Sequence, residues 1–134
     1  MKTIILSVLL TLAYIISFGQ AHLGLSESEI KSLHPDNVWT RNSTNKGIKY
    51  IVSDFFYGTF AYYFDSESSL SDWVIQIPFN NIKLNGQVEE YNKKYVITSD
   101  TTWTAYLDGG TRLYISLLYD EDNKNSYFSY SDTK

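Results

Sequence analysis

Alternation of apolar and polar residues is the strongest pattern in this chain, and it begins at Gly47. A period of two is typical of β-strands that bury one face, so the pattern predicts antiparallel strands. The strands expected in a first meander of about three are 48–53, 59–64 and 73–77, and those of a second meander are 95–99, 102–107, 111–119 and 126–130.

Two short helices are predicted, one before each meander. Ser26 and Glu29 have the spacing of a capping box, and Pro35 ends the first helix. The second helix has Asn80 or Asn81 as its N-cap and an apolar stripe at helical spacing. That stripe consists of Leu84, Val88, Tyr91 and Tyr95. The predicted fold class is α+β, in which two short helices are each followed by an antiparallel β-meander.

The repeated order of helix and meander raises the question of an internal duplication. When the sequence is aligned with itself so that Trp39 matches Trp103, Tyr50 also matches Tyr114. Two interpretations follow. One is a tandem repeat with modules at 24–79 and 80–134, and the other is a single α+β domain over 20–134 whose open sheet packs against both helices.

Residues 1–19 have the composition of a cleaved signal peptide. Lys2 supplies a positive start, and an apolar run without a charge follows from Ile4 to Ile16. The alternative is a membrane-spanning helix, but this needs about 20 apolar residues, which is more than the run provides. Small residues at cleavage spacing favour a cut after Gly19, and a cut after Ala21 is the second option. We therefore expect a periplasmic or extracellular protein without a membrane anchor in its mature chain.

The composition narrows the classes of function. The chain has no cysteine, which excludes disulfides, thiol catalysis and thiolate metal sites. Without disulfides, the fold must be stabilised largely by burial of its aromatic side chains, which are 12 Tyr, 7 Phe and 3 Trp. The net charge is −4 and the largest basic cluster is Lys93-Lys94, so nucleic-acid binding is not expected.

The segment from Gly24 to Ile30, followed by Leu33-His34-Pro35-Asp36, resembles the opening signature of small exported bacterial α+β domains. These domains include the small lipoprotein of the outer-membrane assembly machine and the β-lactamase inhibitory protein. The chain departs from the signature at His34, where the pattern has Gly, and it lacks the lipid-bearing cysteine. The resemblance implies a fold and an exported location, and it implies no activity.

The sequence contains no complete catalytic or metal-binding motif. Its histidines are His22 and His34, and we interpret His34 as a helix-end residue that meets exposed carbonyls. Acidic residues cluster at 65–67, 89–90 and 120–122, where turns or a solvated helix face are expected. We therefore expect a non-enzymatic protein without cofactor or metal. The alternatives are a carboxylate-dependent hydrolase of the cell envelope and a structural or inhibitory module.

Aromatic residues supply the candidate binding site. Phe55, Phe56 and Tyr57 are expected at a hairpin tip, while Tyr63 and Tyr114 are expected on a sheet face away from the core. Tyrosine and tryptophan favour recognition because they bury a large area and keep a polar tip. The expected partner is a protein or an envelope polymer. The alternative interpretation is that these rings pair across strands and stabilise a sheet without disulfides.

Overall fold

The computed structural model describes residues 21–132, so the predicted signal peptide at residues 1–19 lies outside the described residues. The fold over this range is α+β, with one antiparallel sheet of eight strands. The helices are α2 (Glu27–Leu33) and α3 (Asn81–Lys94), and a short 3-10 turn η1 (Asp108–Gly110) joins two strands. The strands are β1 (Thr40–Ser43), β2 (Lys49–Asp54), β3 (Gly58–Phe64), β4 (Ser71–Pro78), β5 (Val96–Ser99), β6 (Thr102–Tyr106), β7 (Arg112–Asp120) and β8 (Asn125–Ser131).

Both meanders are present, but the first has four strands instead of about three. The additional strand is β1, whose sequence TRNS is polar and whose residues are all exposed. It lies at one edge of the sheet and pairs only with β2. Because neither face of this edge strand is buried, its sequence has no alternation that would reveal it.

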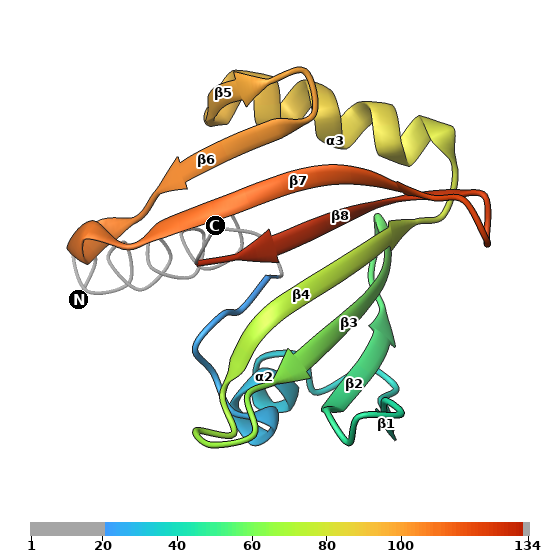
Figure 1. Ribbon diagram of the computed structural model, residues 1–134, viewed down its shortest axis with the longest axis vertical. Coiled ribbons are helices and arrows are strands. Elements are labelled where there is room, and N and C mark those ends of the chain that lie inside the picture. The colour runs from blue at the N-terminus through green and yellow to red at the C-terminus, as the bar shows by residue number, and fades with distance from the viewer. Residues whose placement is uncertain (1–20, 133–134) are drawn as a thin grey trace, which may run out of the picture.

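The two meanders form one continuous sheet with the strand order β1-β2-β3-β4-β8-β7-β6-β5. They meet at a seam where β4 pairs with β8 in antiparallel orientation. Figure 1 shows the halves on either side of this seam, with α2 beside β1–β4 and α3 beside β5–β8. The last strands of the two meanders therefore hold the halves together.

The helix starts and the starts of the last two strands of each half are separated by the same offset along the chain, whereas the starts of β1 and β5 and of β2 and β6 differ from it by two residues and one residue. Glu27 and Asn81 are the first residues of α2 and α3. They are as far apart in the sequence as Gly58 and Arg112, the first residues of β3 and β7. We call this separation the helix-start offset. The shift that aligns Trp39 with Trp103 does not match like elements, because Trp39 precedes β1 whereas Trp103 lies within β6. Aromatic residues in unrelated positions produced that apparent match.

One face of the sheet carries the core. Cross-strand partners share a face, and a row of such partners crosses six strands from β2 to β6. Each residue of this row is at most 3% exposed. The row consists of Ile51, Tyr62, Val74, Tyr130, Ile115 and Trp103.

Both described helices pack on this same face. Tyr91 of α3 lies 5.4 Å from Phe128 and 5.7 Å from Trp103, measured between ring centroids. Ile30 of α2 is fully buried in the same hydrophobic cluster. The opposite face of the sheet is consequently covered by neither described helix.

A buried polar network joins α3 to both strands of the seam. The side-chain amides of Gln76 on β4 and Gln87 on α3 exchange two hydrogen bonds, of 2.6 Å and 2.7 Å. The hydroxyl of Tyr130 donates to Gln76 Oε1 at 2.7 Å, and it lies 2.6 Å from the hydroxyl of Tyr91. Buried amides are tolerated when their hydrogen bonds are made, so this network fixes where α3 sits on the sheet.

The predicted capping box of α2 is confirmed. The Ser26 hydroxyl accepts a hydrogen bond from the Glu29 backbone at 3.3 Å, and the Glu29 carboxylate accepts one from the Ser26 backbone at 2.8 Å. Of the two residues considered for the second helix, Asn80 is the N-cap, and its side chain accepts from the Lys83 backbone at 2.9 Å. Local sequence therefore determines where both helices begin.

A tight turn connects β2 to β3 and requires glycine at its end. The backbone N–H of Phe55 donates to the Gly58 carbonyl at 2.9 Å, which leaves Phe56 and Tyr57 at the tip. A Cβ atom on Gly58 would lie 2.2 Å from the carbonyl oxygen of Ile77 on β4. Glycine is therefore needed because the neighbouring strand approaches closely, and this fixes the position of the tip against β4.

Candidate functional site

The face of the sheet that neither described helix covers carries two adjacent rows of cross-strand partners that span all eight strands, in which Thr104 is buried at 4% exposure. Neither row contains a charged residue or histidine, and we call the two rows together the open face. The first row is Asn42, Tyr50, Tyr63, Trp73, Ser131, Tyr114, Thr104 and Val96. The second row is Thr40, Val52, Ala61, Ile75, Ser129, Ser116, Thr102 and Ser99.

The aromatic rings of the first row stack on one another. The ring centroids of Tyr50 and Tyr63 are 4.9 Å apart with an interplanar angle of 28°, and those of Tyr63 and Trp73 are 4.6 Å apart at 30°. These separations match the spacing between neighbouring strands, which is about 4.7–4.9 Å. The three rings therefore form a ladder that stands on the sheet and presents ring edges outward.

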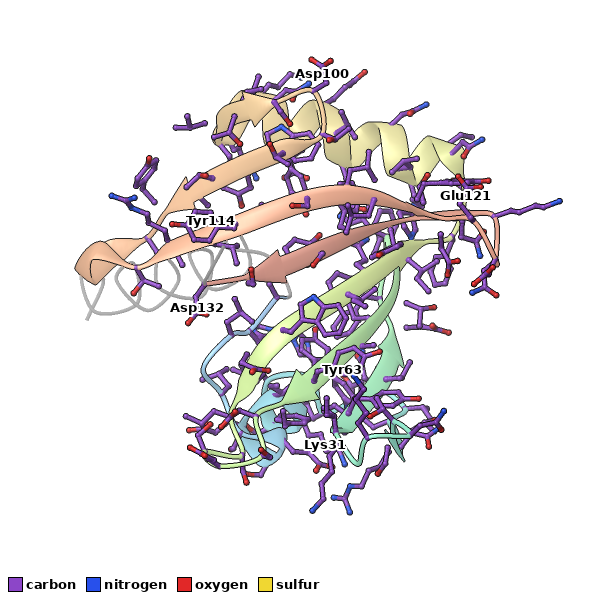
Figure 2. All side chains as sticks on the ribbon, in the orientation of Figure 1. Lys31, Tyr63, Asp100, Tyr114, Glu121 and Asp132 are labelled. Carbon is purple, nitrogen blue, oxygen red and sulfur yellow. The ribbon has the colours of Figure 1, made fainter. Side chains whose placement is uncertain are left out.

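Trp73 extends this ladder across the seam. Its indole N–H donates to the Ser129 hydroxyl on β8 at 2.8 Å, and its side chain remains 39% exposed. On the far side of the seam, Tyr114 continues the row on β7. Figure 2 shows Tyr63 and Tyr114 in the two different halves of the sheet. The open face is thus assembled from both meanders.

The second row is composed of smaller side chains. Serine and threonine occupy it on the β8 side of the seam, and Thr40, Val52, Ala61 and Ile75 occupy it on the other side. Burial raises the pKa of the Tyr63 hydroxyl and the nearby Tyr50 raises it further, so Tyr63 is a neutral hydrogen-bond donor at physiological pH. The open face therefore offers apolar area together with uncharged hydroxyl groups.

The five residues predicted as a binding site occupy three different environments. Tyr63 and Tyr114 share the first row of the open face, as the alternation predicts. Phe56 is 69% exposed at the hairpin tip, and its ring packs against that of Tyr57 with centroids 5.0 Å apart. Phe55 points the other way and joins the core, 5.0 Å from the ring of Phe60. The sequence thus places Phe55 with the tip, whereas the fold uses it to anchor the turn.

Tyr50 and Trp73 belong to the site but were not among the predicted binding residues. Both alternate correctly within their own strands, so their side of the sheet was accessible to sequence analysis. Their position beside Tyr63 depends on the register of β2 and β4 against β3. Strand-by-strand patterns contain no information on that register.

Two acidic side chains from separate elements share one surface pocket of the described structure. Glu27 and Asp65 line one surface pocket of about 510 Å³. Burial alone would raise the pKa of Glu27, but hydrogen bonds from Lys31 and Arg41 lower it below the ordinary value. Hydrogen bonds from Ser68 and from the Glu67 backbone likewise lower the pKa of Asp65. A general acid needs a raised pKa, so neither carboxylate is tuned for that role.

The acidic cluster at residues 120–122 lies in the turn between β7 and β8. Asp120 accepts hydrogen bonds from the Asp122 and Asn123 backbones at 3.0 Å and 3.1 Å. Within residues 21–132, no group of three or more His, Cys, Asp or Glu side chains is arranged to hold a metal ion. In the same range, no helix is long and apolar enough to cross a bilayer.

Comparisons with known proteins add no constraint on the site. No protein-family model, curated protein or solved structure matches this chain. The case for function therefore depends on the geometry of the open face.

Proposed function

We propose that this chain is an exported, non-enzymatic protein that binds a partner protein through the open face. The observation that carries the proposal is the ladder of Tyr50, Tyr63 and Trp73, which continues across the seam to Tyr114 on a face that neither described helix covers. Recognition surfaces on proteins are enriched in Tyr and Trp and depleted of charge at their centre. The open face has both properties.

The stacking of the rings favours a protein over an envelope polysaccharide. Sugar rings bind against exposed aromatic faces, whereas the faces of Tyr63 are occupied by Tyr50 on one side and Trp73 on the other. Ring edges face outward, and these pack against apolar side chains of another protein. We therefore assign a folded protein with an apolar, uncharged contact surface as the partner.

Export is the second part of the proposal. The charge-free run from Ile4 to Ile16 after Lys2 supports a signal peptide at residues 1–19, and the small residues before Gln20 support cleavage there. Expression of the whole chain in a bacterial host, followed by mass measurement of the protein in each cell fraction, tests this part. Recovery of a chain that begins at Gln20 or His22 outside the cytoplasm is expected. Recovery of the uncut chain in the cytoplasm would contradict export.

Duplication of an ancestral helix-meander unit is the origin that we propose for the two halves. It is supported by the N-caps Ser26 and Asn80, which are separated by the helix-start offset, and by the starts of β3 and β7 and of β4 and β8, which are separated by the same offset. Self-comparison of a set of homologous sequences tests this origin. The highest similarity is expected at the offset that aligns Ser26 with Asn80, and an equal score at every other offset would oppose duplication.

Site-specific photo-crosslinking tests the binding face. A photoreactive side chain at Leu118, which is 44% exposed two positions after Ser116 of the open face, is expected to crosslink the partner. The same group at Ile82, which is 82% exposed on α3, is the matched control and is expected to give no product.

Two variants complete the test. Trp73→Ser combined with Tyr114→Ser is expected to abolish the crosslink at position 118, because both halves of the row lose their aromatic contact. Ile82→Ser is expected to leave that crosslink intact. An unchanged crosslink in the double variant, with circular dichroism showing a folded sheet, would refute the open face as the binding site. Retention on insoluble cell-wall polymer in place of a protein crosslink would refute the choice of partner.

A further inference from the structure

The two histidines of the chain meet within the described fold. The Nε2 atoms of His22 and His34 lie 2.7 Å apart, with ring centroids separated by 5.0 Å. His34 is the C-cap of α2, and sequence analysis interpreted it as a residue that meets helix carbonyls. Its ring instead faces His22, which comes from the segment before the helix. A hydrogen bond between the two rings therefore joins that segment to α2.

This hydrogen bond limits the number of protons that the pair can hold. One Nε2 atom donates its hydrogen and the other accepts it with a lone pair, so the accepting ring is not protonated. If both rings were protonated, the bond would be lost and two positive charges would face each other across 2.7 Å. Separate histidines in water each take up a proton near pH 6.5. The joined pair consequently holds fewer protons in mild acid than the separated pair does.

The surroundings of the pair oppose protonation as well. The ring of His34 meets that of Phe55 edge-on with centroids 4.8 Å apart, and the ring of His22 stacks on that of Tyr62 at 6.2 Å. Burial, together with the neighbouring His34, lowers the pKa of His22 to about 4, and burial also lowers the pKa of His34. These effects act in the same direction as the hydrogen bond.

The other titratable groups near the pair do not compensate for a second proton. Burial raises the pKa of the Tyr62 hydroxyl, which stays neutral, and Lys31 of α2 is held in an ion pair of 2.7 Å within its own helix. Burial raises the pKa of Asp72, the second residue of β4, and other carboxylates raise it further. Asp36, in the turn after α2, lines a surface pocket that includes neither histidine. Within residues 21–132, no carboxylate forms a metal-type cluster of three with the two histidines.

The segment that carries His22 covers part of the core. Ala21 is only 5% exposed and belongs to the hydrophobic cluster. The Ser71 hydroxyl at the start of β4 donates to the His22 carbonyl, and the Gly24 N–H donates to the Ser71 carbonyl at 2.7 Å. His22 also has a positive φ of 38°, a conformation that is uncommon outside glycine. A strained residue thus lies in the segment that the histidine pair joins to α2.

We propose that the pair of His22 and His34 is a pH-sensitive latch, which holds residues 21–25 on the core at neutral pH and releases them in mild acid. When the segment separates, both rings reach water and each takes up a proton, which the joined pair cannot do. Lower pH favours the state that binds more protons, so the released population rises as the pH falls below 6.5. The latch is independent of the open face, because Tyr62 and Phe55 belong to the core side of the sheet.

Hydrogen exchange at the Gly24 amide, measured by NMR at several pH values, tests the latch. This N–H is protected while it donates to Ser71 and exchanges when the segment is released. Its protection, corrected for the intrinsic exchange rate at each pH, is expected to fall by about twentyfold or more between pH 7 and pH 5. The Phe128 amide, on the central strand β8, is the internal control and is expected to keep its protection. The whole chain and the product that begins at Gln20 are both suitable, since each has residues ahead of His22.

Two variants separate the histidines from other acid effects. His22→Gln combined with His34→Gln removes both titrating rings, and the two amides can hydrogen-bond to each other as Gln76 and Gln87 do. This variant is expected to protect Gly24 equally at pH 7 and pH 5. Glu27→Gln is the matched control on α2. It is expected to show the wild-type fall, because the pKa of Glu27 lies below 4.5.

Several outcomes would overturn the latch. One is unchanged protection of Gly24 in the wild type, and another is an equal fall in the double variant. An equal loss of protection at Phe128 would mean that the whole fold opens, which also contradicts release of the segment alone. If the double variant is unprotected already at pH 7, the imidazole resonances of the wild type decide the question. Proton uptake by both rings is expected to coincide with the loss of Gly24 protection, and uptake by both while Gly24 stays protected would refute the latch.

Discussion

Ile75 of β4 and Ser129 of β8 are cross-strand partners at the seam, and they are separated along the chain by the helix-start offset. Under the proposed duplication, the two residues occupy equivalent positions in the two halves. Since the row that contains Ile75 and Ser129 belongs to the open face, the proposed binding surface exists only when the halves are joined.

The glutamine pair at the seam yields a prediction about stability. Gln87→Leu removes the partner of the Gln76 side-chain amide, which is 0% exposed. A buried donor without a partner costs about 1–3 kcal/mol, so urea denaturation is expected to show a decrease of that size in the free energy of unfolding. The double variant Gln76→Leu with Gln87→Leu is expected to lose less than the sum of the single changes, because no amide is then left unpaired. Additive losses would show that the two amides do not act as a pair.

Two glycines are expected to respond oppositely to alanine. Gly58→Ala places a Cβ atom 2.2 Å from the Ile77 carbonyl oxygen and should destabilise the protein by about 1–3 kcal/mol. Gly86→Ala, inside α3, meets no atom within 4 Å and should stabilise it by about 0.5–1 kcal/mol. Thermal unfolding of both variants measures the difference. A stable Gly58→Ala protein would mean that β3 and β4 separate more easily at the tip than their contact indicates.

Glu27 is predicted to contribute to the loss of stability in acid. Burial opposes its ionisation, but hydrogen bonds from Lys31 and Arg41 outweigh this and lower its pKa in the folded protein below 4.5. A depressed carboxyl pKa stabilises the fold above the ordinary value, and this stabilisation is lost as the pH falls through the folded pKa. Glu27→Gln should therefore flatten the decline in unfolding free energy below pH 4.5. Glu121→Gln, which removes a carboxylate without a salt bridge to any described residue, should leave the decline unchanged.

The hairpin tip provides a second contact to test. Phe56 is 69% exposed, and the ammonium group of Lys83 lies 3.3 Å from the centroid of its ring. Replacement of Phe56 and Tyr57 by Ser is expected to change the melting temperature little, since an exposed cation–π pair contributes about 0.5–1 kcal/mol. The same variant is expected to lose partner capture if the tip extends the binding surface, as the sequence predicts. Unchanged capture would restrict recognition to the open face.

Much of the local structure is predictable from sequence. Ser26 and Glu29 specify the start of α2 because their hydrogen bonds join positions only three apart. Alternation places Tyr63 and Tyr114 away from the core because successive side chains of a strand point to opposite faces. This reasoning does not apply to Phe55. A turn residue does not alternate between two faces as a strand residue does, and the ring of Phe55 packs against the core.

The sequence by itself therefore determined the α+β class, the helix starts and the alternating strands, all of which depend on neighbours within a few positions. Only the tertiary structure decided that β4 pairs with β8, that Tyr50, Tyr63 and Trp73 form a ladder, and that His22 meets His34. These contacts depend on register and chain direction between separate segments. A period of two is unchanged when one strand slides past another by a full period, so it cannot specify which residues become partners.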